Sequence, residues 1–142
     1  MKAVMLLALV LSTAQAAEPT GTRTLACEGT ATDKSAVYKI CSRTATCIRK
    51  PPWPVSMGII VNFKARTVTG FKDIDFPLPI TTVDELHIQF QHIGAAGQGS
   101  VTGSIDRITG GVEVSAHNLV NTDPEGAWFD YSLKCKPTQR MF

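Results

Sequence analysis

Apolar and polar residues alternate with a period of two along much of this chain, which is typical of strands with one face in a core. The clearest stretch begins at residue 86, where opposite faces carry Leu86, Ile88 and Phe90 against His87, Gln89 and Gln91. Residues 127–136 alternate in the same way. No stretch after residue 16 has the 3.6-residue period of a long amphipathic helix. The pattern therefore predicts an all-β protein.

The alternating stretches predict a single antiparallel meander of about seven or eight strands. The hairpin turn at residues 107–110 is the clearest connection, because Gly110 can adopt a positive φ and Asp106 can accept hydrogen bonds from the amides of the turn. We expect strands at residues 24–32, 37–41, 57–63, 67–71, 86–91, 100–106, 111–117 and 127–136.

Prolines interrupt this pattern in two places. Residues 50–54 hold three prolines around Trp53, and proline cannot donate a hydrogen bond to a central sheet ladder. We therefore expect a structured loop over residues 42–56. Residues 73–82 contain Pro77 and Pro79, and we expect them to form an extended linker.

The first sixteen residues have the pattern of a secretory signal peptide. Lys2 precedes an apolar run that is too short to span a bilayer, and Ala14-x-Ala16 is a pattern that signal peptidase can cut. Residues 17–142 are then expected to form one exported domain, periplasmic or secreted. No later apolar run approaches the roughly 20 residues of a membrane-spanning helix, so no integral membrane span is expected.

Four cysteines in an exported chain predict two disulfides. Three pairings are possible, and we favour Cys41 with Cys47, which closes a short polar loop, and Cys27 with Cys135, which joins the first strand to the last. Zinc is disfavoured because ligand pairs in zinc sites are usually two to four residues apart, whereas the closest cysteines here have five residues between them.

The long bridge would join two core positions. Cys27 shares a strand face with Leu25, and Cys135 shares one with Leu133. If the two strands are neighbours, the sheet closes as a small barrel, and if they face each other, the fold is a sandwich. We favour the barrel. An immunoglobulin domain has a tyrosine two residues before its second cysteine, where this chain has Leu133. We therefore do not expect an immunoglobulin domain.

Charge and motifs point away from several functions. The chain has 14 Lys and Arg against 12 Asp and Glu, which is far from the basic stripe of a nucleic-acid-binding protein. His87 and His92 fall on opposite faces of a strand and cannot chelate one ion there. No Gly-x-Ser-x-Gly elbow occurs, and the glycine-rich residues 94–99 lead into a strand rather than a phosphate-binding helix. We predict no catalytic residue, metal or cofactor.

Three residues are candidates for contact with a ligand or partner. Trp53 is held among prolines, and a preorganised aromatic ring suits a binding hot spot, although the same ring could instead plug one end of the barrel. Arg49 lies in the same loop. Trp128 lies on the polar face of the last strand, where it is either exposed or packed across neighbouring strands.

The C-terminal third carries a resemblance. The ending from Tyr131 to Pro137 and from Gln139 to Phe142, together with the hairpin of residues 104–110, resembles a group of small uncharacterised exported proteins of Gram-negative bacteria. The resemblance implies a periplasmic or secreted setting. It implies no activity and no site residue.

These observations favour a non-enzymatic periplasmic or secreted module that binds a small apolar ligand or a protein. One alternative is a secreted inhibitor or envelope interaction protein that acts through the loop of residues 41–54. A second is a hydrolase with an unrecognised site, using His87 or His117 with a carboxylate. The expected barrel interior is lined by Leu86, Ile88, Phe90, Val101, Ile105, Val112, Val114, Phe129, Tyr131 and Leu133.

Overall fold

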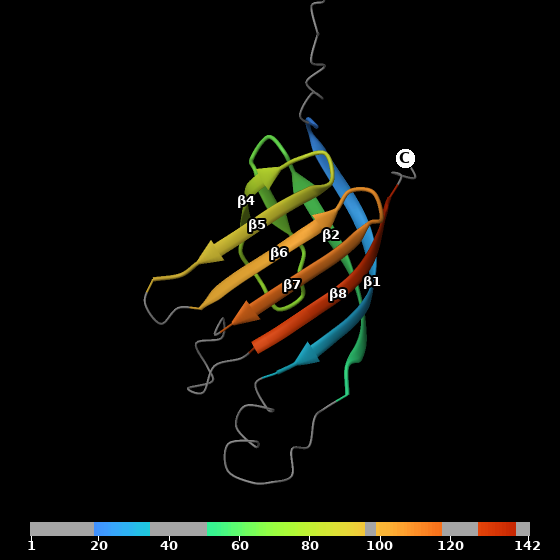
Figure 1. Cartoon of the computed structure of the whole chain (residues 1–142), viewed down its shortest axis with the longest axis vertical. Coiled ribbons are helices and arrows are strands. Elements are labelled where there is room, and N and C mark those ends of the chain that lie inside the picture. The colour runs from blue at the N-terminus through green and yellow to red at the C-terminus, as the bar shows by residue number, and fades with distance from the viewer. Residues whose placement is uncertain (1–18, 35–50, 96–98, 118–127, 139–142) are drawn as a thin grey trace, which may run out of the picture.

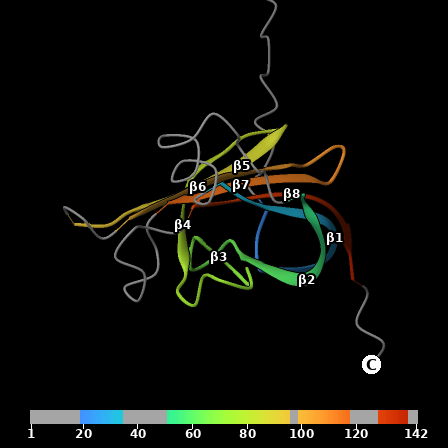
Figure 2. The ribbon, with the colours of Figure 1, turned by 90° about the horizontal axis from the view of Figure 1, so that it is seen from below.

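The described residues form a closed antiparallel barrel in which each strand pairs with the next (Figure 1). The computed structural model describes residues 19–34, 51–95, 99–117 and 128–138. Figure 2 shows that β5 to β8 form one gently curved layer, while β1 to β4 curve round the opposite side. The strands are β1 Thr22–Asp33, β2 Trp53–Asn62, β3 Thr67–Thr69, β4 Leu78–Val83, β5 His87–Ile93, β6 Ser100–Asp106, β7 Gly111–His117 and β8 Trp128–Pro137.

The barrel closes where β1 pairs with β8. Cys27 lies directly opposite Cys135 in this ladder, their Cα atoms are 4.0 Å apart, and the two residues form a disulfide. The predicted long bridge is therefore confirmed, and it joins neighbouring strands of a barrel rather than facing sheets of a sandwich. Cys41 and Cys47 lie outside the described residues, as does the strand predicted at residues 37–41.

The alternation along the strands fills the barrel with apolar side chains. Eight of the ten predicted interior residues are buried. The exceptions are Phe129, which is only partly buried against the core, and Leu86, which is half exposed because β5 begins one residue later and Leu86 lies in the preceding turn. The prediction for Leu86 was wrong because the alternating pattern in the sequence begins one residue before the strand does.

Residues 73–82 are not an extended linker, as the prolines led us to predict. Residues 78–83 form β4, and Pro79 is accommodated because the pairing of β4 with β5 begins only at Ile80. Before β4, the chain turns and buries Phe71 and Ile74 in the core. Phe76 packs 4.7 Å from the ring of His92, near the end of β5, so this segment covers one end of the barrel.

A buried tyrosine fastens this segment to β8. Tyr131 is 1% exposed, its hydroxyl donates a hydrogen bond to the Asp73 carboxylate, and its ring lies 6.3 Å from that of Phe71. Burial and the hydrogen bond to Asp73 both raise the pKa of Tyr131. The hydroxyl therefore stays protonated and remains a donor across the physiological pH range.

The predicted loop of residues 42–56 ends earlier than expected, because β2 begins at Trp53. Pro54 pairs with Thr30 of β1. The described partner of β2 on its other side, β3, pairs only with residues 60–62, so the missing N–H of Pro54 costs no hydrogen bond to that strand. A proline is tolerated inside β2 because this part of the strand is not paired with β3.

Gly103 makes room for the ring of Phe90. It lies in β6 between Phe90 of β5 and Val114 of β7. A Cβ atom built on Gly103 would come within 2.4 Å of the Phe90 ring. The ring thus occupies the space that any other side chain at this position would need.

Removing the bridge with the pair Cys27→Ala and Cys135→Ala should lower the free energy of unfolding by about 4–5 kcal/mol. The bridge spans a sequence separation of 108, and cutting so large a loop frees the unfolded chain. Urea denaturation of both proteins measures the change. A loss below about 1 kcal/mol would contradict the importance of the bridge for closure.

Gly103→Ala should destabilise the barrel by about 1–3 kcal/mol, because the new methyl group collides with Phe90. Gly58→Ala is the matched control in β2, where a Cβ would have nothing within 4 Å, and stability should be unchanged or slightly higher. Thermal unfolding measures both variants. Equal losses in the two would show that the Phe90 contact is not the cause.

Candidate functional site

A pocket of about 500 Å³ opens at the end of the barrel opposite Phe76. It is lined by the β6–β7 turn, the start of β1 and the end of β8. These segments lie in the upper part of Figure 1. Its volume falls within the range of small-molecule sites, roughly 300–1,000 Å³. Its apolar wall is formed mainly by Leu25, Val61, Phe63, Ile88, Ile105 and Ile108.

The pocket deepens from an exposed rim to a buried floor. Val61, Ile88 and Ile105 belong to the buried core and supply the floor, next to Cys135 of the disulfide. Ile108 stands at the rim and is 74% exposed, which is unusual for an isoleucine in a turn. An apolar ligand group that enters the pocket would therefore contact both the outer face of the core and Ile108.

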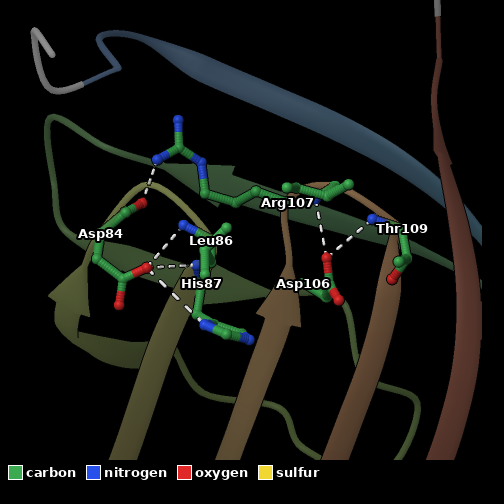
Figure 3. Close-up of polar contacts among 7 residues, drawn as sticks. Asp84, Leu86, His87, Asp106, Arg107 and Thr109 are labelled. Carbon is green, nitrogen blue, oxygen red and sulfur yellow. Dashed lines mark hydrogen bonds and ion pairs between the residues drawn. The ribbon is translucent and has the colours of Figure 1, made fainter.

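The β4–β5 turn, which is joined to the rim of the pocket, is built around Asp84 (Figure 3). One carboxylate oxygen of Asp84 accepts hydrogen bonds from the backbone N–H of Leu86 at 2.8 Å and of His87 at 2.7 Å. The backbone N–H of Asp84 donates in turn to the carbonyl oxygen of His87 at 2.9 Å. These three bonds fix the turn from within.

The second turn repeats this design around Asp106, as predicted. One Asp106 carboxylate oxygen accepts hydrogen bonds from the backbone N–H of Ile108 and of Thr109, each at 2.8 Å (Figure 3). Gly110 has a φ of 72°, the left-handed conformation expected of this glycine. Its N–H donates to the carbonyl oxygen of Asp106 at 2.9 Å. The capping carboxylate therefore holds Ile108 in place at the rim.

Arg107 ties the two turns together. Its backbone N–H donates to the carbonyl oxygen of Leu86 at 2.7 Å, and its guanidinium donates to the carbonyl oxygen of Asp84 (Figure 3). The second turn is also anchored to β8, because the N–H of Cys135 donates to the carbonyl oxygen of Gly110 at 2.8 Å. The rim is therefore joined to both the β4–β5 turn and the disulfide.

Both capping carboxylates are held in their charged form. Hydrogen bonds from the backbone N–H groups of His87 and Leu86 lower the pKa of Asp84 below its ordinary value of 3.8. The backbone N–H and the hydroxyl of Thr109, followed by the N–H of Ile108, lower the pKa of Asp106 in the same way. In each case the carboxylate is committed to the turn.

A second hollow, of about 480 Å³, lies on the outer face of β5 to β8. It is shallow and polar, because the residues that alternate with the core point outward there. Its floor includes Gln89, Gln91, Thr102, Ser104, Glu113 and Ser115. This surface is the solvated face expected of a half-buried sheet.

One edge of that face holds a serine, a histidine and an aspartate close together. The hydroxyl of Ser115 donates to Asp130 at 2.7 Å and lies 3.2 Å from Nε2 of His117. A serine hydrolase needs the carboxylate to orient the histidine. Here Asp130 instead accepts hydrogen bonds from Ser115 and from the indole N–H of Trp128, and pairs with Lys34.

This edge cluster also keeps Asp130 a poor base. Burial raises the pKa of Asp130, but the contacts with Lys34, Ser115 and Trp128 together outweigh that effect and lower it. The ring of Trp128 stacks 4.3 Å from His117, and the Lys34 ammonium lies 5.5 Å from the centre of the same ring. The arrangement suits stabilisation of the sheet surface better than activation of the Ser115 hydroxyl as a nucleophile.

Of the candidate residues named from the sequence, Trp53 and Trp128 do not line the end pocket. Trp53 is the first residue of β2, is partly buried and packs against the core. Trp128 is partly buried in the edge cluster. Arg49 lies outside the described residues. Their roles in binding stay predictions.

The histidines are dispersed, as the alternation predicted for His87 and His92. His87 lies on the outer face 3.8 Å from Asp84, whereas His92 faces inward against Phe76. Within the described part of the chain, no three His, Cys, Asp or Glu residues come together as a metal site would require. No helix among the described residues is long and apolar enough to cross a membrane.

Sequence reasoning missed the residues that form the rim. Arg23 and Ile108 both line the pocket. Ile108 could have been noticed as an apolar residue in an otherwise polar turn, Arg107-Ile108-Thr109-Gly110. Arg23 gave no local signal, because only the barrel brings β1 close to the β6–β7 turn.

Asp106→Asn should flatten the fall of stability in acid. The folded-state pKa of Asp106 is lowered, so its contribution is complete above the unfolded pKa and is lost as the pH falls through the folded value. The free energy of unfolding, measured in urea from about pH 5 to pH 2, should decline less steeply than in the unmodified protein. Glu85→Gln, in the first turn, is the control and should preserve the original slope.

Comparison with protein-family models, with curated proteins and with solved structures gives no match for this chain. A barrel of this kind supports many functions. The function must therefore be argued from the site itself.

Proposed function

We propose that this protein is an exported, non-enzymatic binding module that takes the apolar part of a small ligand into the end pocket of its barrel. The observation that carries the proposal is the apolar pocket beside the β6–β7 turn, with Ile108 exposed at its rim. The signal-like N-terminus and the disulfide support the export part of the proposal.

The shape of the barrel supports binding at its end rather than at its centre. The middle is occupied by the rings of Phe71, Phe90 and Tyr131. The ring centre of Phe71 lies 5.7 Å from that of Phe90 and 6.3 Å from that of Tyr131. Eight-stranded barrels are often filled by side chains in this way. A ligand would therefore rest on this packed core without displacing it.

The rim is organised before any ligand arrives. The carboxylates of Asp84 and Asp106 fix the two turns, and Arg107 joins them. A site whose loops are already ordered loses less conformational entropy on binding. Burial of apolar surface, at about 25 cal/mol per Å², then contributes to affinity with little ordering cost.

The two alternatives lack support of this kind. An interaction loop at residues 41–54 falls mostly outside the described residues, and its Trp53 packs against the core. A hydrolase would use His87 or His117 with a carboxylate. Asp130 contacts Ser115 rather than His117, and the Asp84 oxygen nearest His87 already accepts two backbone hydrogen bonds. The pocket is the feature that most favours a function.

Ile108→Ser should weaken binding of an uncharged apolar probe, N-phenyl-1-naphthylamine, roughly tenfold. The substitution removes an apolar contact with the probe worth about 1–2 kcal/mol. Because the side chain of Ile108 is largely exposed, the fold should be unaffected. Fluorescence titration measures the affinity.

Ile93→Ser is the matched control for this test. Ile93 is 71% exposed, similar to Ile108, but lies at the other end of β5. Its substitution should leave probe affinity unchanged. If both variants bind the probe as the unmodified protein does, or if the unmodified protein binds no probe, the proposed function is wrong.

A further inference from the structure

Resting on the proposed function, we infer that the ligand is an anionic amphiphile whose carboxylate or phosphate head group lies between Arg23 and Arg107 while its apolar tail enters the pocket. Both arginines line the same pocket as the apolar wall. They come from distant parts of the chain, since Arg23 pairs with Val61 near the start of β1 and Arg107 follows the end of β6.

Within the described part of the chain, no salt bridge joins Arg23 to a carboxylate, whereas Arg107 lies near the Asp84 carboxylate, whose pKa its charge helps to lower. The guanidinium of Arg107 donates a hydrogen bond to the backbone carbonyl oxygen of Asp84, and this carbonyl group bears no net charge. Lys34 with Asp130 and His87 with Asp84 are salt bridges between described residues, and neither involves Arg23 or Arg107. A guanidinium remains charged at any physiological pH and offers several N–H donors to a planar anion.

The one acidic residue in the pocket wall does not cancel this charge. Asp106 lines the pocket, but its oxygen is bound by the N–H groups of Ile108 and Thr109. Among the described residues that line the pocket, two guanidinium groups face one carboxylate, which is a net charge of +1; Asp84, which lies near Arg107, is not one of them. A single anionic head group would complement it.

The apolar floor and the charged mouth of the pocket together determine the orientation of the ligand. Ile88 and Ile105 lie on the buried floor, whereas both arginines are exposed at the mouth. A tail that contacts the floor would therefore present its head to the arginines. An uncharged head would gain no charge–charge attraction from the arginines, and a cationic head would be repelled.

The outer hollow provides a contrast within the same molecule. The described residues of its wall include Glu113 and Asp130 and no lysine or arginine. An anion is therefore expected to avoid the polar face and to select the end pocket.

The test compares ligands that share a ten-carbon chain and differ in head group: decanoate, decyl phosphate, decanol and decyltrimethylammonium. Each competes with N-phenyl-1-naphthylamine for the protein with its disulfide intact. We expect at least one of the two anions to bind at least tenfold more tightly than decanol, and the cation to bind least. The tighter anion identifies the head group as carboxylate or phosphate.

Arg23→Gln should weaken the preferred anion about tenfold and weaken the uncharged probe much less, because the probe has no anionic head group. Arg107→Gln provides a second variant, in which the probe affinity shows whether the rim has been disturbed. Lys72→Gln is the matched control, because it removes one exposed positive charge in the segment that covers the other end of the barrel.

The outcomes separate this inference from the proposed function. If decanol competes as well as both anions, or if Arg23→Gln and Lys72→Gln weaken the anion equally, the head-group assignment is overturned while the apolar pocket stands. If neither the probe nor any of the ten-carbon ligands binds, the proposed function fails and the inference fails with it.

Discussion

The pairing of β1 with β8, fastened by Cys27 and Cys135, is the constraint on which the rest of the molecule depends. Without it, the meander would be an open sheet with two exposed edges, a form that tends to associate. The same closure builds the pocket, because Cys135 lines it and donates its N–H to Gly110 of the rim turn. Closure and binding site therefore share one strand.

The two ends of the barrel differ, and that difference gives the molecule one candidate binding end. Phe71, Ile74 and Phe76 close the end toward which β5 runs. At the opposite end, short turns capped by Asp84 and Asp106 leave the floor of the core accessible. The chain thus uses apolar side chains to fill one end and hydrogen-bonded turns to hold the other open.

The sequence was most informative where local rules decide the structure. Alternation predicted the core faces of β6, β7 and β8, and the Asp106 and Gly110 pattern predicted the turn between β6 and β7. It failed at β4, because Pro79 lies at a ladder position where its lost N–H matters little, and that is a property of the partner strands. Arg23 could not be recognised because its site exists only once the barrel has closed.

Chemical-shift mapping of the ¹⁵N-labelled protein with decanoate tests the central claim most directly, since it reports where the ligand contacts the barrel. The account predicts that the amides of Leu25, Ile108 and Gly110 shift together and saturate with one affinity. Shifts concentrated instead at Gln89, Thr102 and Ser115 on the outer face, or no shifts at all, would contradict it.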